Sequence, residues 1–199
     1  MMKKLTTLAL GLVAVCSLTA CGDGKGTKTS EEDFKKKAEA VQEPATPYTS
    51  ATFKYKGTVK GSTFLGEEET KLDSKLNGSI EFTYENGKWS AKDKADDETV
   101  ESYVEMVGVS IKEMIAEDSF DMEGQGTVTY YSNPLGVEIT YDGKTDGAAM
   151  SGNAYMAFNG NGYLSKVEVN MKMDMTVEMA GVKSGTVATT KFSATISYK

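Results

Sequence analysis

Residues 167–179 alternate without interruption between apolar and polar side chains, and no other feature of the chain constrains the fold as strongly. The odd positions are valine or methionine, and the even positions are Glu, Asn, Lys, Asp or Thr. Because successive side chains of a β-strand point to opposite faces, this segment is expected to be a long strand with one apolar face. The same period of two recurs at 53–59, 127–131, 137–141 and 192–198, so a strand-rich chain is expected.

Short glycine-containing turns separate these strand-like segments. Asn86-Gly87 is a two-residue hairpin signal, and further turns are indicated at 159–162 and 181–185. Parallel neighbours would need crossover connections of about a dozen residues or more, so the pairing is predicted to be antiparallel.

Two segments have helical periodicity instead. Residues 31–42 follow a Ser30–Asp33 capping pattern. Residues 98–116 carry apolar side chains at i, i+3, i+4 and i+7 spacing, with acidic residues opposite. The fold class is therefore predicted to be α+β and mostly antiparallel β. We expect a single curved sheet or half-open barrel with the 98–116 amphipathic helix across one face.

The first residues have the layout of a secretory signal. Lys3 and Lys4 precede an apolar run at 5–15, which is shorter than the roughly 20 residues that a membrane-spanning helix needs. The run leads to the motif LTAC at 18–21. This motif resembles the lipobox of bacterial lipoproteins, the site that lipoprotein signal peptidase recognises.

The resemblance implies that residues 1–20 are removed as a lipoprotein signal peptide and that Cys21 receives a diacylglyceryl group with fatty acids such as palmitate. Two such chains anchor stably because each buried methylene contributes roughly 0.8 kcal/mol. The protein is then expected to be extracytoplasmic and lipid-anchored to a bacterial membrane. Residues 21–30 are interpreted as the lipidated cysteine and a flexible tether, and 31–199 as a single β-rich domain.

The composition excludes several kinds of catalytic and metal-binding site from that domain. The only cysteines are Cys16 and Cys21, and the chain has no histidine. Without thiol or imidazole groups, disulfides, cysteine- or histidine-based catalytic sites and cysteine-ligated zinc are excluded. Adjacent acidic residues, as at 67–69 and 96–98, are interpreted as solvated turn charges. The chain is therefore predicted not to be an enzyme and to have no cofactor and no metal site.

The net charge is acidic. All basic residues are lysines, and removal of Lys3 and Lys4 takes the formal charge from −7 to −9. Binding to nucleic acid is dominated by neutralisation of phosphates, so no nucleic-acid partner is expected. By the same argument, anionic headgroups are not expected to attract the domain.

The methionines of 167–179 allow three interpretations: ordinary core, the lining of an apolar-ligand cup, or a copper(I) site. Copper is disfavoured because i and i+2 side chains lie roughly 6.6–6.8 Å apart along a strand and do not converge. Methionine adapts to varied apolar partners, which favours a cup, yet it also fills cores. Thirteen residues span roughly 43 Å, more than one helix covers, so both roles are open. The residues predicted to line such a cup are Met171, Met173, Met175, Val177, Met179, Phe192 and Ile196.

The order of elements resembles the LolA-type lipoprotein-carrier fold and the related mycobacterial LppX/LprG-type lipoproteins. The similar features are the capped helix EEDFKKKAEAVQ running into TFKYKGTVKG, the mid-chain helix, and the long closing strands after FNGNGYLSKV. The resemblance covers 31–199 at the level of pattern and implies a half-open barrel that holds acyl chains. No functional residue of this chain can be assigned from the resemblance.

Together these features predict a membrane-anchored, non-catalytic lipoprotein that binds a lipid or other apolar small molecule in a concave sheet. The alternative is a surface-displayed structural or interaction lipoprotein that binds a protein or cell-wall polymer and no small molecule. The identity of a protein partner is not indicated by the sequence.

Overall fold

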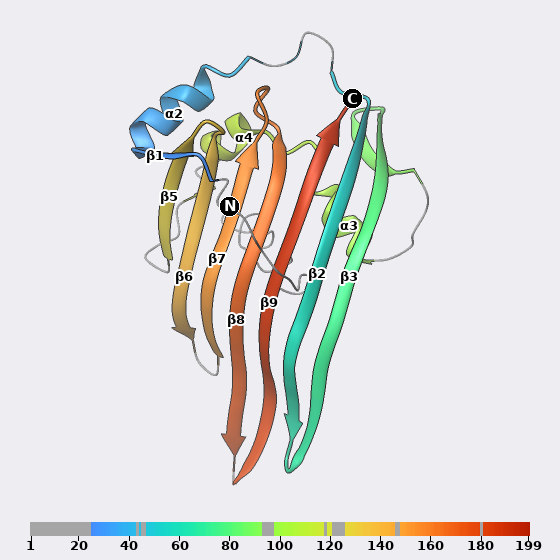
Figure 1. The fold of residues 1–199 in the computed structure, drawn as a ribbon, viewed down its shortest axis with the longest axis vertical. Helices are drawn as coiled ribbons and strands as arrows, with labels where there is room; N and C mark the ends of the chain where they lie inside the picture. Colours follow the sequence, from blue (N-terminus) through green and yellow to red (C-terminus); the bar gives the residue numbers. More distant parts are fainter. Residues whose placement is uncertain are drawn as a thin grey trace.

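A computed structural model of the chain describes residues 25–42, 44, 47–92, 98–117, 119–120, 126–145, 148–179 and 181–199. The strands in these residues form one open sheet of nine, in the order β1-β5-β6-β7-β8-β9-β2-β3-β4 (Figure 1). All neighbours pair antiparallel, so the prediction of a mostly antiparallel β fold is confirmed. The strands are β1 (Thr27–Thr29), β2 (Ser50–Leu65), β3 (Glu68–Glu85), β4 (Lys88–Ala91), β5 (Gly126–Ser132), β6 (Gly136–Thr145), β7 (Ala148–Phe158), β8 (Leu164–Met179) and β9 (Val182–Tyr198).

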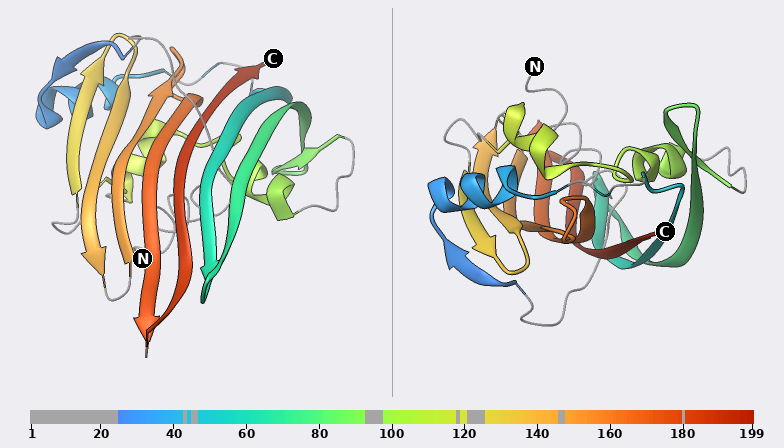
Figure 2. Two further views of the ribbon diagram at one scale, coloured as in Figure 1. Left: turned by 60° about the horizontal axis from the view of Figure 1, so that its bottom comes forward. Right: turned by 90° about the horizontal axis from the view of Figure 1, so that it is seen from above.

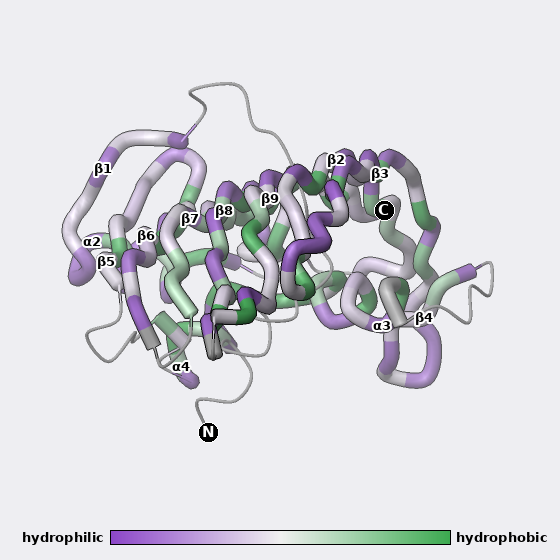
Figure 3. Tube along the Cα trace, turned by 90° about the horizontal axis from the view of Figure 1, so that it is seen from below, coloured by the Kyte–Doolittle hydropathy of each residue, from purple (hydrophilic) through white to green (hydrophobic). Residues whose placement is uncertain are grey.

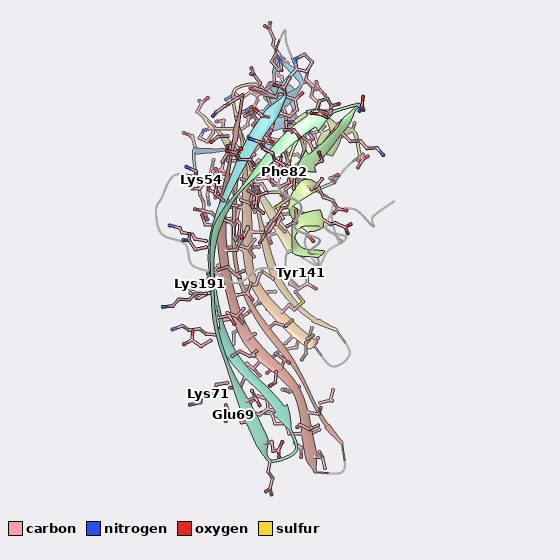
Figure 4. The ribbon with its side chains drawn as sticks, turned by 90° about the vertical axis from the view of Figure 1, so that its right-hand side faces the viewer. Lys54, Glu69, Lys71, Phe82, Tyr141 and Lys191 are labelled. Atoms are coloured by element: carbon pink, nitrogen blue, oxygen red, sulfur yellow. The ribbon has the colours of Figure 1, made fainter. Side chains whose placement is uncertain are left out.

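Four of the strands are much longer than the rest and lie side by side. β8, β9, β2 and β3 have 16 to 18 residues each and follow one another in the sheet. They bend along their length, and their lower ends extend past the helices (Figure 4). One side of the sheet is therefore concave, and it is the side on which Phe82 and Tyr141 lie.

The N-terminal helix is α2 (Glu31–Glu39), where a helix is expected from the Ser30 cap. The Ser30 hydroxyl accepts a hydrogen bond from the Asp33 amide at 3.1 Å, which satisfies one of the free N–H groups of the first turn. Phe34 and Ala38 are fully buried, and the Phe34 ring lies 5.0 Å from that of Tyr130 on β5. The helix thus covers the β5 end of the sheet.

The structure differs from the flexible tether predicted for 21–30. Thr27–Thr29 form β1, which pairs with β5 at Ser132 to Tyr130. The backbone groups of a sheet edge need partners, and β1 supplies them for this part of β5. We call residues 25–29 the N-terminal strap. Figures 2 and 3 show β1 on the opposite side of the sheet from α3 and α4. Residues 21–24 lie outside the described part of the chain.

The single helix predicted over 98–116 is wrong, because the segment forms α3 (Glu98–Val104) and α4 (Ile111–Ala116). The break includes Gly108, whose φ of +86° suits glycine. A Cβ on Gly108 would lie 2.3 Å from the indole nitrogen of Trp89. The Gly108 amide instead donates to the Tyr198 hydroxyl at 3.1 Å, which donates in turn to the Leu164 carbonyl at 2.8 Å. Contacts with β4 and β9 therefore interrupt the helix.

The main core lies between the concave face and the α3–α4 segment. The Tyr103 ring of α3 stacks 4.7 Å from Phe53 on β2 and 6.3 Å from Phe192 on β9. Met106, Ile111 and other apolar side chains of the segment are buried in the same cluster. No helix in the described part of the chain has the length and apolar character needed to cross a membrane.

Candidate functional site

The apolar face of β8 starts in the core and emerges from it along the strand. Val169 and Met171 are 3% and 7% exposed, whereas Met175 and Val177 are 42% and 45% exposed. Met173, between them, is half-buried. Because large exposed apolar groups in a continuous patch commonly mark binding surfaces, the lower half of this face is the candidate site.

Neighbouring strands continue the same face. The register places Ala188 of β9 opposite Met173, and Leu65 of β2 opposite Ser184 of β9. Leu65 is 69% exposed and Val182 is 51% exposed. We call the residues of this surface the open apolar face. They are Val59, Leu65, Leu72, Met150, Met173, Met175, Val177 and Val182.

Gly152 allows β7 and β8 to approach closely where this face leaves the core. Its φ is +146°, and it pairs with Met171. A Cβ at this position would lie 2.1 Å from the Asn170 carbonyl oxygen and 2.7 Å from the Met171 Cα. Only glycine avoids this collision with the neighbouring backbone, so Gly152 holds the strand pair at the border of the open apolar face.

The polar groups beside the three methionines are hydroxyls, and Glu68 lies farther along the same face, in the row of Val177 and Leu65. The rows of paired residues that contain Met171, Met173 and Met175 hold apolar residues, Ser, Thr and Gly across β8, β9, β2 and β3. Hydroxyl groups can orient a ligand through hydrogen bonds, but they do not exchange protons readily near neutral pH. Among the described residues, no three acidic side chains come together as a metal-binding group.

The residues predicted to line a cup fall into two groups in the structure, one on the open apolar face and one in the core. Met173, Met175 and Val177 lie on the open apolar face. Phe192 is fully buried opposite Val169, and Ile196 is 4% exposed opposite Phe53. Met171 is also buried, so these three residues belong to the core. Met179 ends β8, opposite Val182, and its side chain lies outside the described residues.

The sequence prediction did not include five of the eight residues of the open apolar face. Val59 and Leu72 follow the period-two pattern, but only the register shows that they lie on the same side as the methionines. Leu65 and Val182 flank turns and carry no periodic signal of their own. Met150 lies directly opposite Met173, so the register places these two methionines on the same side of β7 and β8.

A second cluster of polar residues lies on the convex side of the sheet. Glu138 on β6 accepts hydrogen bonds from Lys25 at 2.5 Å, Asn153 at 2.6 Å and Tyr131 at 2.7 Å. Burial alone would raise the pKa of Glu138, but these three donors together lower it. Burial, and the hydrogen bond to Glu138, raise the pKa of Tyr131 to about 12. Glu138 is therefore an ionised carboxylate that fixes the N-terminal strap.

We expect Glu138→Gln to destabilise the protein by about 1–2 kcal/mol at neutral pH, because it weakens charge-assisted hydrogen bonds at a partly exposed site. A lowered folded pKa contributes stability above the unfolded value of about 4.3, and that stability is lost as the pH falls through the folded pKa. Denaturant unfolding at a series of pH values tests this. The difference between wild type and Glu138→Gln should shrink in acid, and a difference independent of pH would contradict the assignment.

Cys21 lies outside the described residues. No protein-family model matches the chain, and a search of curated proteins finds no match.

Proposed function

We propose that the chain is a non-catalytic, extracytoplasmic lipoprotein, anchored to a bacterial membrane through Cys21, that holds a lipid or other apolar ligand on its open apolar face. The main support for ligand binding is that the exposure of the apolar side chains of β8 rises from Met171 to Val177. If the apolar face served only as core, it would not extend beyond the helical segment that covers it. Instead it continues beyond the α3–α4 segment along four long strands.

The finer architecture that this function needs is a half-open cup. The α3–α4 segment would close its upper part, where Tyr103 packs on Phe53 and Phe192. The lower part would receive the ligand between Met173, Met175 and their neighbours. Each buried methylene of a ligand contributes roughly 0.8 kcal/mol, so an acyl chain gains affinity with length. Methionine side chains adapt to such chains without a fixed shape.

The anchoring part of the proposal is supported by the sequence of the leader. Lys3, Lys4 and the apolar run at 5–15 lead to LTAC at 18–21, in the layout of a lipobox. The non-catalytic part is supported by the residue types. The chain has no histidine, and the hydrogen-bonded Glu138 has a lowered pKa, opposite to the shift expected of a general acid.

Native mass spectrometry of residues 22–199, produced without the leader and followed by organic extraction, tests ligand binding. We expect a lipid to co-purify with the wild type and to be lost from Met173→Asp and Met175→Asp, because a carboxylate on the apolar face must be desolvated when a ligand covers it. Circular dichroism checks that both variants are folded.

Asn170→Asp is the matched control, since Asn170 is exposed on the opposite side of the same strand and the substitution adds the same charge. It should retain the lipid. A wild-type protein free of lipid would refute ligand binding and favour the alternative, a surface-displayed lipoprotein that binds a protein or cell-wall polymer.

A further inference from the structure

The convex face of the sheet is rich in lysine, although the chain as a whole has a net charge of −7. Four consecutive rows across β3, β2, β9 and β8 contain seven lysines and two acidic residues, a net charge of +5. The other seven positions are Ser, Thr or Asn. We call this surface the lysine face. Its rows are Ser79–Lys54–Thr195–Lys166, Asn77–Lys56–Ser193–Glu168, Lys75–Thr58–Lys191–Asn170 and Asp73–Lys60–Thr189–Lys172.

Most of these lysines are available to a partner. Lys54, Lys56, Lys60, Lys75 and Lys172 are exposed. Figure 4 shows Lys54 and Lys191 projecting from the convex side, away from the helices. Within the lysine face, Lys166 pairs with Glu168 at 2.9 Å. The remaining positive charge is therefore concentrated over β2 and its two neighbours.

On the other side of the sheet, the helical segment carries acidic residues. The α3–α4 segment lies there, and its exposed acidic residues are Glu101, Glu105, Glu113 and Glu117. Layers packed on a sheet lie about 10 Å from it, which exceeds the Debye length of about 8 Å at physiological ionic strength. A charged surface placed against the lysine face would therefore interact with its lysines more strongly than with the distant acids. The net charge of the chain does not describe this face.

The N-terminal strap reaches the same side of the sheet. The Lys25 ammonium lies on Glu138, a convex-side residue, and 5.7 Å from the centre of the Tyr155 ring. Lys166 of the lysine face lies 5.8 Å from the same ring. Three residues lie between Cys21 and Lys25, so Cys21 is at most about 14 Å from Lys25. The proposed anchoring residue therefore connects to the domain on the same side of the sheet as the lysine face.

We propose that the lysine face is the membrane-facing surface of the anchored protein and that its lysines contact the phosphates of anionic lipids. This inference rests on the proposed anchoring at Cys21. The anchor keeps the domain within reach of the headgroups, and the lysines determine which side turns toward them. Basic residues near an anionic leaflet attract it over roughly one Debye length. The open apolar face is then directed away from the membrane and stays accessible to ligands.

The test uses the full chain, processed and lipidated in bacteria and reconstituted into vesicles that contain phosphatidylglycerol and a lipid with a headgroup quencher. Intact mass first establishes acylation of Cys21. A fluorophore is then attached at Asn77→Cys on the convex side or at Ser74→Cys on the concave side, both exposed positions of β3. We expect quenching at Asn77 to exceed quenching at Ser74 by about twofold or more, and about 1 M salt, with a Debye length of roughly 3 Å, to reduce the difference.

Charge variants show whether the lysines cause this orientation. Lys54→Gln, Lys56→Gln and Lys60→Gln together should remove most of the difference between the two labels. The combination of Lys36→Gln, Lys37→Gln and Lys112→Gln, which removes the same charge outside the lysine face, should leave it unchanged. Vesicles of phosphatidylcholine alone should also give a reduced difference.

The outcomes separate the two proposals. Acylated protein with equal quenching at the two labels, or with stronger quenching at Ser74, would refute the orientation alone. Absence of the acyl mass at Cys21 would refute the anchoring and the orientation with it. Lysine-dependent binding of soluble polyphosphate, without any asymmetry on vesicles, would assign the lysine face to a phosphate polymer and overturn the lipid assignment.

Discussion

Phe192→Ala is expected to lower the free energy of unfolding by about 3–5 kcal/mol, the range for truncating a buried aromatic side chain. Phe192 is fully buried and stacks 6.3 Å from Tyr103, so its loss removes contacts that join β9 to α3. Because the α3–α4 segment cannot collapse fully into the space, a cavity adds to the lost burial. Denaturant unfolding at neutral pH measures the change.

Leu65→Ala is the control for this prediction. Leu65 is 69% exposed on the open apolar face, so its truncation should change the free energy of unfolding by no more than about 0.5 kcal/mol. If Phe192→Ala were as mild as Leu65→Ala, Phe192 would line an open cup and not the core.

Gly152→Ala is expected to destabilise the protein by about 3 kcal/mol or more, because two costs add. The φ of +146° is a conformation that alanine rarely adopts. In addition, the new Cβ would lie 2.1 Å from the Asn170 carbonyl oxygen, which belongs to a backbone and cannot rotate away. Either β7 must shift from β8 or the pairing at Met171 must break. Thermal and denaturant unfolding both report the loss.

Gly160→Ala provides the comparison. Gly160 lies in the turn before β8 and has no atom within 4 Å of an added Cβ, so the substitution should be nearly neutral. A Gly152→Ala protein as stable as Gly160→Ala would show that the close approach of β7 and β8 is not needed. Lipid retention by a folded Gly152→Ala variant would show whether the open apolar face depends on it.

The sequence predicts the sheet well because strand periodicity is local. The alternation at 167–179 places Met171, Met173 and Met175 on one side, and the register agrees. Exposure along that side is not local, since it depends on where the α3–α4 segment lies. The pattern therefore could not separate Met171, which is buried, from Met175, which is exposed.

The expectation of one continuous helix at 98–116 failed for a different reason. The apolar spacing of this segment is helical throughout, but the backbone turns at Gly108 because Trp89 and Tyr198 contact it there. These partners lie 19 and 90 positions away in the chain, so no local pattern indicates the break. A glycine inside a helical pattern was the only available signal.

Net charge likewise conceals how charge is arranged. The acidic total predicts no attraction to anionic headgroups, whereas the register concentrates lysines on the convex side. Alternation shows that Lys54, Lys56 and Lys60 share one face of β2. It cannot show that Lys75 and Lys191 flank Thr58 on the same surface, since strand neighbours follow from the topology.

The N-terminal strap also determines how the domain would carry mechanical load. With Cys21 held in a membrane, drag on the domain would pass through Lys25 and β1 before any other strand. β1 pairs over three residues, whereas β2 and β3 pair over sixteen. The strap would therefore peel off under tension while the sheet stays folded. The link from Cys21 would then run to Glu31, a reach of about 35 Å in place of about 14 Å. In an anchored protein, the three-residue β1 would be the first strand to lose its pairing under load, before the long strands of the sheet.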